Sequence, residues 1–172
     1  MRVLVDTGVL LRVFDRTNAE QQRIIFRALR KLWSDGNELV TTAQNISEFW
    51  NVSTRPAAAR GGYGLAVEVV EKRVQVIERL GEVLPFSAQA YQLWRRLVMN
   101  YQIVGVSVHD ARIVASMQDA SISHILTMNS AAFSVTPKSR FLRRMEWRRR
   151  NSERSDLSFV KTSISQLLSQ SR

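Results

Sequence analysis

The sequence contains no cysteine, only two histidines and no long apolar segment. Without cysteine, disulfides and thiolate metal sites are excluded, and the absence fits a reducing compartment. No apolar stretch approaches the roughly 20 residues needed to span a bilayer. The apolar N-terminal run is broken by Asp6 and Arg12, which argues against a signal peptide. We therefore expect a cytoplasmic protein with no membrane partner.

Signatures of several other chemistries are also missing. His109 and His124 do not have zinc-ligand spacing to any other ligand. The run Gly61-Gly62-Tyr63-Gly64 lacks the sequence context of a nucleotide-binding loop, and no Ser-His-Asp signature occurs. These absences argue against a zinc site, a nucleotide cofactor and serine-type acyl transfer.

Negative charge is scarce relative to positive charge. The chain carries 25 Lys or Arg against 15 Asp or Glu, giving a net charge of +10 and a pI near 11.1. Residues 137–172 contain ten of the basic and three of the acidic side chains, so this tail holds most of the excess. Such a balance favours contact with a polyanion such as nucleic acid.

Four short apolar runs alternate with segments of helical periodicity. The runs at 3–5, 38–42, 82–85 and 123–127 predict strands, because they are short and bounded by turn or capping residues. Helices are predicted for about 18–33, 42–54, 65–80, 87–100 and 107–119. Thr41 and Gln44 predict a capping box at the start of the second of these helices, and the Tyr, Trp and Phe side chains are expected mostly on apolar helix faces. This alternation predicts one α/β domain with a mainly parallel sheet and helices on both faces.

Three carboxylates occupy comparable positions in successive units of this pattern. Asp6 ends the first strand, Glu48 lies one turn into the helix after the second, and Asp110 lies in the first turn of the helix before the fourth. Asn129 follows the fourth strand. Because strand ends and the starts of following helices share one edge of a parallel sheet, these side chains are expected to converge. Converging carboxylates repel, and hard cations such as Mg²⁺ or Mn²⁺ relieve that repulsion.

Each of these residues also has a purely structural interpretation. Asp6 and Asn129 could serve as turn residues, and Glu48 could be a solvated helix residue. Asp110 could be the acidic member of a capping box opened by Ser107. Residue type and spacing alone leave these alternatives open.

Four stretches together resemble the PIN domain family, including the VapC-type toxins. They are VDTGVLLR (5–12), TTAQNISEFWNVSTR (41–55), SVHDARIVASM (107–117) and ILTMNSAAF (125–133). The resemblance spans residues 1 to about 135 in the family's order. It implies a three-layer α/β/α sandwich with a central sheet of four to five strands. It further implies a ribonuclease that uses Mg²⁺ or Mn²⁺ to cleave single-stranded RNA.

By position, the resemblance assigns roles to six residues. Asp6, Glu48 and Asp110 would be catalytic metal ligands, and Asn129 would stand where many members have a fourth acid. Two hydroxyl residues, Thr7 and Thr127, would support the site.

Two residues depart from the family pattern. Gly8 replaces an Asn that is frequent in the first motif. Asn129 supplies a neutral amide oxygen, which weakens the field for a second cation. One well-held metal ion is therefore expected.

The end of the chain also departs from the pattern. Only Phe133 to Val135 is apolar where a last strand is usual, so that strand is expected to be short or missing. We place the domain at 1–136 and a basic extension, flexible or partly helical, at 137–172, with a short helix at 156–169. Candidate phosphate contacts in RNA are Arg12, Arg143, Arg144, Arg148, Arg149 and Arg150.

The resulting hypothesis is a metal-dependent endoribonuclease, the toxin of a type II toxin–antitoxin pair. It would act as a homodimer with a cognate antitoxin as partner. The alternative is a catalytically weakened PIN-like module that binds RNA or protein, which Asn129 and the unusual C-terminus motivate.

Overall fold

The computed structural model describes residues 1–59, 61–128 and the strand at 160–163. Its strands are β1 (Arg2–Val5), β2 (Glu38–Thr42), β3 (Glu82–Leu84), β4 (His124–Thr127) and β5 (Val160–Ser163). Its helices are α1 (Thr7–Phe14), α2 (Ala19–Ser34), α3 (Ala43–Thr54), α4 (Val67–Leu80), α5 (Ala88–Tyr101) and α6 (Ser107–Asp119). None of these helices combines the length and apolar character needed to cross a bilayer.

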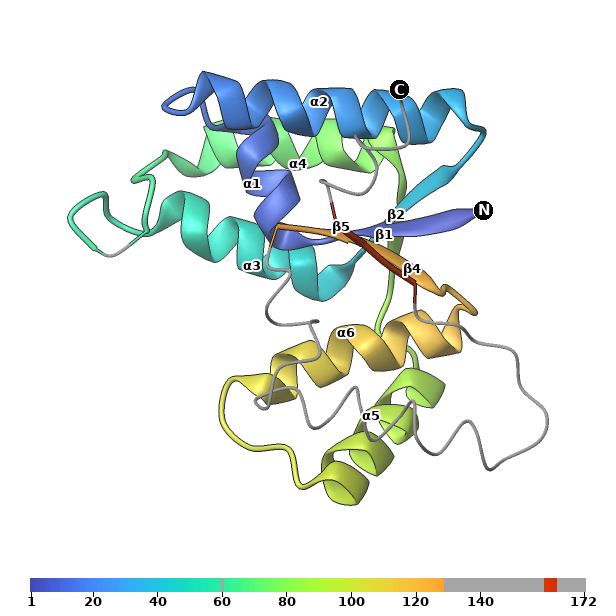
Figure 1. Ribbon diagram of the computed structural model, residues 1–172. Helices are drawn as coiled ribbons and strands as arrows, with labels where there is room; N and C mark the ends of the chain where they lie inside the picture. Colours follow the sequence, from blue (N-terminus) through green and yellow to red (C-terminus); the bar gives the residue numbers. More distant parts are fainter. Residues whose placement is uncertain (60, 129–159, 164–172) are drawn as a thin grey trace.

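The strands form one five-stranded sheet in the order β3-β2-β1-β4-β5, and every neighbouring pair is parallel. Helices α1 to α4 cover one side of the sheet and α5 and α6 the other (Figure 1). The predicted three-layer α/β/α sandwich with a parallel sheet of four to five strands is therefore confirmed. Because all strands run the same way, their carboxyl ends share one edge.

Alternation along β1 explains how the two helical layers are held. Val3 and Val5 pack with residues of α1 to α4, whereas Leu4 faces the opposite core with Ile113 and Met117 of α6. Leu4 is completely buried and lies between Val40 and Ile125 in the neighbouring strands. This period of two, buried on both faces, makes β1 the centre of the domain.

The fifth strand corrects the prediction for the end of the chain. β5 pairs in register with β4, from His124 opposite Val160 to Thr127 opposite Ser163. The helix predicted for 156–169 is therefore wrong at these four residues. Val160 and Thr162 are β-branched and suit a strand, whereas the helical spacing was inferred from residues that flank it. The proposed division at residue 136 lies outside the described residues.

Helix α1 was not predicted, and two aromatic positions were assigned to the wrong environment. The run from Thr7 to Phe14 is helical and capped by Asp6. Trp33 and Tyr91, expected on apolar helix faces, are 46% and 42% exposed. Their helices bury aliphatic residues instead. Only part of each apolar helix face contacts the core, and these two aromatic residues lie outside that part.

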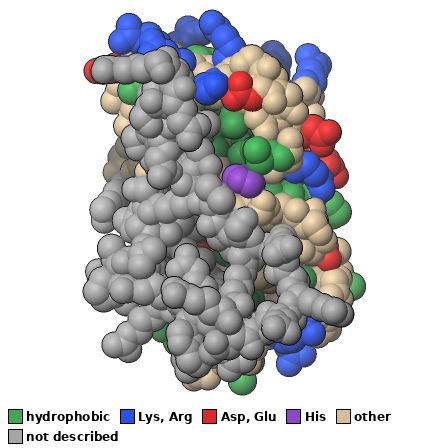
Figure 2. Space-filling model, turned by 45° about the vertical axis from the view of Figure 1, so that its right-hand side comes forward, with side chains coloured by type: hydrophobic (Ala, Val, Ile, Leu, Met, Phe, Trp, Pro, Cys, Tyr) green, Lys and Arg blue, Asp and Glu red, His purple; other side chains and the backbone are tan. Residues whose placement is uncertain are grey.

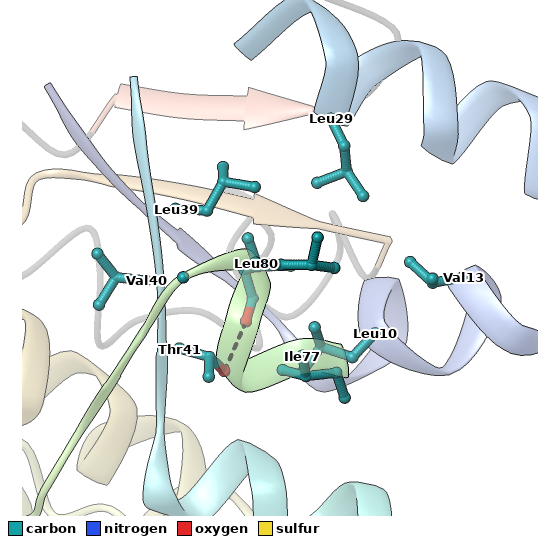
Figure 3. Close-up of a pocket in the computed structure, with 10 residues that line it drawn as sticks. Leu10, Val13, Leu29, Leu39, Val40, Thr41, Ile77 and Leu80 are labelled. Atoms are coloured by element: carbon teal, nitrogen blue, oxygen red, sulfur yellow. Dashed lines mark hydrogen bonds between the residues drawn. The ribbon is translucent and has the colours of Figure 1, made fainter. Parts of the chain in front are cut away.

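A small apolar cavity remains between the sheet and helices α1, α2 and α4 (Figure 3). Its volume is about 20 Å³. The lining is aliphatic except for Thr41, whose hydroxyl donates a hydrogen bond of 3.2 Å to the Val5 carbonyl. With its single polar side chain satisfied and this volume, the cavity is a packing gap and not a ligand site.

Gly81 connects α4 to β3 where the chain passes close to β2. A Cβ added at Gly81 would lie 2.2 Å from the Leu39 carbonyl oxygen, which is backbone and cannot move aside. We expect Gly81→Ala to lower the free energy of unfolding by about 1–3 kcal/mol, as overpacking does. Gly8→Ala is the matched control, because its Cβ would meet only Met128 at 3.7 Å. Equal stability of the two variants in urea unfolding would contradict this packing.

Candidate functional site

Asp6 lies where β1 ends and α1 begins. Its backbone N–H donates to the Leu126 carbonyl at 3.0 Å, which ties it to β4. One carboxylate oxygen accepts from the Thr7 backbone N–H at 2.8 Å, and the other accepts from the Thr127 hydroxyl at 2.7 Å. The turn interpretation of Asp6 therefore holds in part, since Asp6 caps α1. The same bonds also fix its carboxylate at the carboxyl edge of the sheet.

Asn45 organises the start of α3, a role that its sequence context does not predict. The Asn45 side-chain oxygen accepts a hydrogen bond from the Thr42 backbone N–H at 3.2 Å, and the Asn45 backbone N–H donates to the Thr42 hydroxyl at 3.1 Å. The capping box is thus Thr42 with Asn45, one residue later than the predicted Thr41 with Gln44. The Asn45 amide also donates to the Thr7 hydroxyl at 2.9 Å and to Asp6 at 3.4 Å.

Glu48 is held by two donors, which contradicts the interpretation of a solvated helix residue. The Thr7 hydroxyl donates to one of its oxygens at 2.7 Å and the Gln44 side-chain amide to the other at 2.8 Å. The same Gln44 nitrogen donates to the His109 carbonyl at 3.1 Å. Gln44 therefore links Glu48 on α3 to the first turn of α6, next to Asp110.

Asp110 projects from the first turn of α6 and is not part of a capping box. The residue before the helix is Val106, and no side chain caps this helix end. The predicted Ser107 capping box is therefore wrong. Unlike Asp6 and Glu48, the Asp110 carboxylate accepts no hydrogen bond from the residues that the structure describes. Its position is not explained by capping, and its oxygens stay available.

The three acids influence one another electrostatically. Burial raises the pKa of Asp110, and the negative charges of Asp6 and Glu48 raise it further. Burial also raises the pKa of Asp6, opposed by the hydrogen bonds from Thr127 and Thr7, while Glu48 adds to the rise. The carboxylates therefore face a common region in which negative charge is unfavourable, and a cation would relieve this.

The three acids do not by themselves surround a space for a metal ion. Within the described ranges, no three Asp, Glu or His side chains stand close enough to enclose a metal ion together. Mg²⁺ does not require such a cage, because it keeps several waters and commonly binds through one or two carboxylates and substrate phosphates. The hard oxygen donors, the unused oxygens of Asp110 and the mutual repulsion fit a hydrated divalent cation.

The remaining predicted site residues divide into two groups. Thr7 and Thr127 both donate hydrogen bonds to the acids, and their role as supporting residues stays a prediction. Arg12 pairs with the Asp15 carboxylate on the same helix end, and its role toward RNA stays a prediction. Outside the described residues lie Asn129, Arg143, Arg144, Arg148, Arg149 and Arg150.

Comparison with known proteins gives one family match and several structural ones. The model of the PIN domain matches residues 3–139. No curated protein matches the sequence.

The structural matches share the fold at low identity. VapBC2 from Rickettsia felis, bound to a DNA fragment from its promoter, is 14% identical with a TM-score of 0.57, covering 80% of this chain and 94% of that one. VapC20 from Mycobacterium tuberculosis, a sarcin-ricin loop cleaving toxin, is 18% identical with a TM-score of 0.52, covering 78% and 96%. VapBC-1 from nontypeable Haemophilus influenzae is 12% identical with a TM-score of 0.58, covering 96% and 99%.

Proposed function

Since this chain belongs to the PIN domain family, we propose that it is a metal-dependent endoribonuclease that cleaves single-stranded RNA. The observation that supports the proposal is the electrostatic influence of Asp6, Glu48 and Asp110 on one another's surroundings near the carboxyl edge of the sheet. These acids come from three separate elements. Besides burial, the charge of Glu48 raises the pKa of Asp6, and the charges of Asp6 and Glu48 raise the pKa of Asp110. A fold that only needed stability would gain nothing from this repulsion.

The ion would be Mg²⁺ or Mn²⁺, held by Asp6, Glu48 and Asp110 together with Asn129, partly through water. When bound, it supplies a water of lowered pKa and neutralises charge on the phosphate. The protein's contribution is positional. Thr7 and Gln44 keep Glu48 oriented, Thr127 keeps Asp6 ionised and oriented, and Asp110 offers the least encumbered carboxylate.

We further propose that the protein is the toxin of a type II toxin–antitoxin pair, a homodimer with a cognate antitoxin. The support is the shared fold with VapC20 and with the toxin–antitoxin complexes VapBC2 and VapBC-1. The alternative, a PIN-like module that binds RNA or protein without cleaving it, is favoured by the absence of a closed acidic cage in the described part of the chain.

RNA cleavage by the full chain separates these two functions. Cleavage of a single-stranded RNA is expected with Mg²⁺ or Mn²⁺ and not with a chelator, and Asp6→Asn and Glu48→Gln should each abolish it. RNA binding without cleavage under every metal condition would establish the non-catalytic alternative. Cleavage that survives chelation would refute the metal-dependent mechanism.

Removing the Thr127 hydroxyl should change the pH dependence of cleavage. Its hydrogen bond lowers the pKa of Asp6, so Thr127→Val should raise that pKa further. A carboxylate that must be ionised then becomes active only at higher pH. We expect the acidic limb of the kcat/KM profile to move to higher pH, with little change at the alkaline end. An unmoved acidic limb would show that Asp6 ionisation does not control the reaction.

A further inference from the structure

The outer face of α2 combines arginines with exposed aromatic rings. Arg23, Arg27 and Arg30 are exposed, and Phe26 and Trp33 are 44% and 46% exposed. At 100° per residue these side chains fall within about one third of the helix circumference. Figure 2 shows Lys and Arg side chains gathered at the top of the molecule, the height at which α2 lies in Figure 1.

The positive charge of this face is not neutralised locally. None of the three arginines pairs with an acid of the described residues, whereas Lys31 on the neighbouring side of the helix pairs with Asp35 at 3.1 Å. Arg23, Phe26, Arg27 and Arg30 also line a shallow hollow of about 410 Å³, together with Ala19 and Gln22. The face is therefore cationic, and its side chains border this hollow.

The rings distinguish this face from an ordinary solvated helix surface. The buried side of α2 is formed by Ile25, Ala28, Leu29 and Leu32. Phe26 and Trp33 are therefore not needed to cover the core. Arginines that track a phosphate backbone, with aromatic rings on which unpaired bases stack, are the combination that binds single-stranded nucleic acid.

We propose that this α2 face, defined by Arg23, Phe26, Arg27, Arg30 and Trp33, is a docking surface for single-stranded RNA outside the catalytic site. The arginines contact phosphates and the two rings stack on bases. From Arg23 to Trp33 the surface extends about 15 Å along the helix. Because α2 leads back from the carboxyl edge to the start of β2, its Arg23 end is the one nearer the acids. The inference rests on the proposed RNA substrate and not on cleavage.

The test measures binding of a labelled oligouridylate by the full chain. A chelator is present, so that metal-dependent cleavage does not occur. Replacing Arg23, Arg27 and Arg30 together by Gln should weaken binding. It should also make the negative slope of log K against log salt shallower by about 2, given about 0.7 per phosphate contact. Replacing Phe26 and Trp33 by Leu should weaken binding about fivefold or more while leaving the salt slope unchanged. Melting temperatures close to that of the wild type establish that each variant is folded.

The matched control replaces Lys72, Arg79 and Arg96 by Gln, which removes the same charge from exposed positions on α4 and α5. An equal loss of binding in the control would overturn the proposal, because net charge alone would then explain the loss.

An unchanged salt slope in the α2 arginine variant would overturn the proposal too. If the α2 arginine variant keeps RNA binding but loses binding to poly-glutamate, the proposal is also overturned, because the surface would then bind an acidic protein partner. Wild-type binding without cleavage in Mg²⁺ or Mn²⁺ would refute the nuclease and leave this surface standing.

Discussion

Asp110→Asn is expected to reduce cleavage of single-stranded RNA by at least about 100-fold. The carboxylate lies in the first turn of α6, uncapped and without a hydrogen bond from the described residues, so its oxygens are free for an ion. Loss of one charged ligand removes several kcal/mol of electrostatic stabilisation from the reaction, and each 1.4 kcal/mol corresponds to a factor of ten in rate. The measurement is kcat/KM with Mn²⁺ at saturating metal concentration.

The same substitution should stabilise the metal-free protein at neutral pH. The pKa of Asp110 is raised in the fold, first by burial and then by Asp6 and Glu48. The folded state therefore holds protons more tightly than the unfolded state, and stability is lost as the pH rises from the unfolded pKa through the folded one. Asn carries no charge and escapes this loss.

Thermal melts in a chelator test this part of the expectation. Asp110→Asn should melt at a higher temperature than the wild type at pH 7, and the difference should shrink toward pH 4. Divalent metal should raise the melting temperature of the wild type and not that of the variant. Asp119→Asn is the matched control, because it lies at the other end of α6. A variant that cleaves normally, or that melts below the wild type at neutral pH, would contradict the assignment of Asp110.

Asn45→Ala is expected to cost about 2–4 kcal/mol of folding free energy, a large effect for a single polar residue. Asn45 is completely buried, and its amide contacts Thr42, Thr7 and Asp6. Truncation removes the side-chain acceptor of the Thr42 backbone N–H, and a buried unsatisfied group costs about 1–3 kcal/mol. The Thr7 hydroxyl still donates to Glu48 but loses the hydrogen bond from Asn45, which adds about 1 kcal/mol.

Asn45→Ala should also reduce cleavage more than its stability loss explains, since Thr7 then no longer has a fixed orientation toward Glu48. Asn51→Ala is the matched control, because it removes the same amide from an exposed position on the same helix. Urea unfolding and cleavage well below the melting temperature separate the two effects. Equal stabilities of the Asn45 and Asn51 variants would show that the hydrogen-bond network does not support the fold.

The central sheet was predicted correctly from the sequence, because it depends on local patterns. Short β-branched runs that alternate with periodic helices specify parallel strands, and strand ends then coincide at one edge. That rule predicts that Asp6, Glu48 and Asp110 lie at this edge, and their role as metal ligands stays a prediction. Asn45 could not be predicted in this way, because its importance comes from contacts with Thr7 and Asp6, which are 38 and 39 residues away in the chain.

Other differences between prediction and structure arise from tertiary context. β5 pairs with β4, and although Val160 and Thr162 suit a strand, nothing local at 160–163 identifies β4 as the partner. Ser107 had the sequence of a cap, but α6 begins without a side-chain cap. Trp33 follows the helical period of the apolar residues in α2, but it lies at the margin of the buried stripe and is partly exposed. The sequence does not show how wide the contact between the helix and the sheet is.

The most direct test of the central claim is a titration of RNA cleavage with Mn²⁺, carried out beside Mn²⁺ binding measured by electron paramagnetic resonance. The wild type should bind Mn²⁺ and cleave single-stranded RNA with the same metal dependence, and Asp110→Asn should lose both. Cleavage that persists in the chelator, or equal Mn²⁺ binding by the wild type and Asp110→Asn, would contradict the metal site at the carboxyl edge of the sheet.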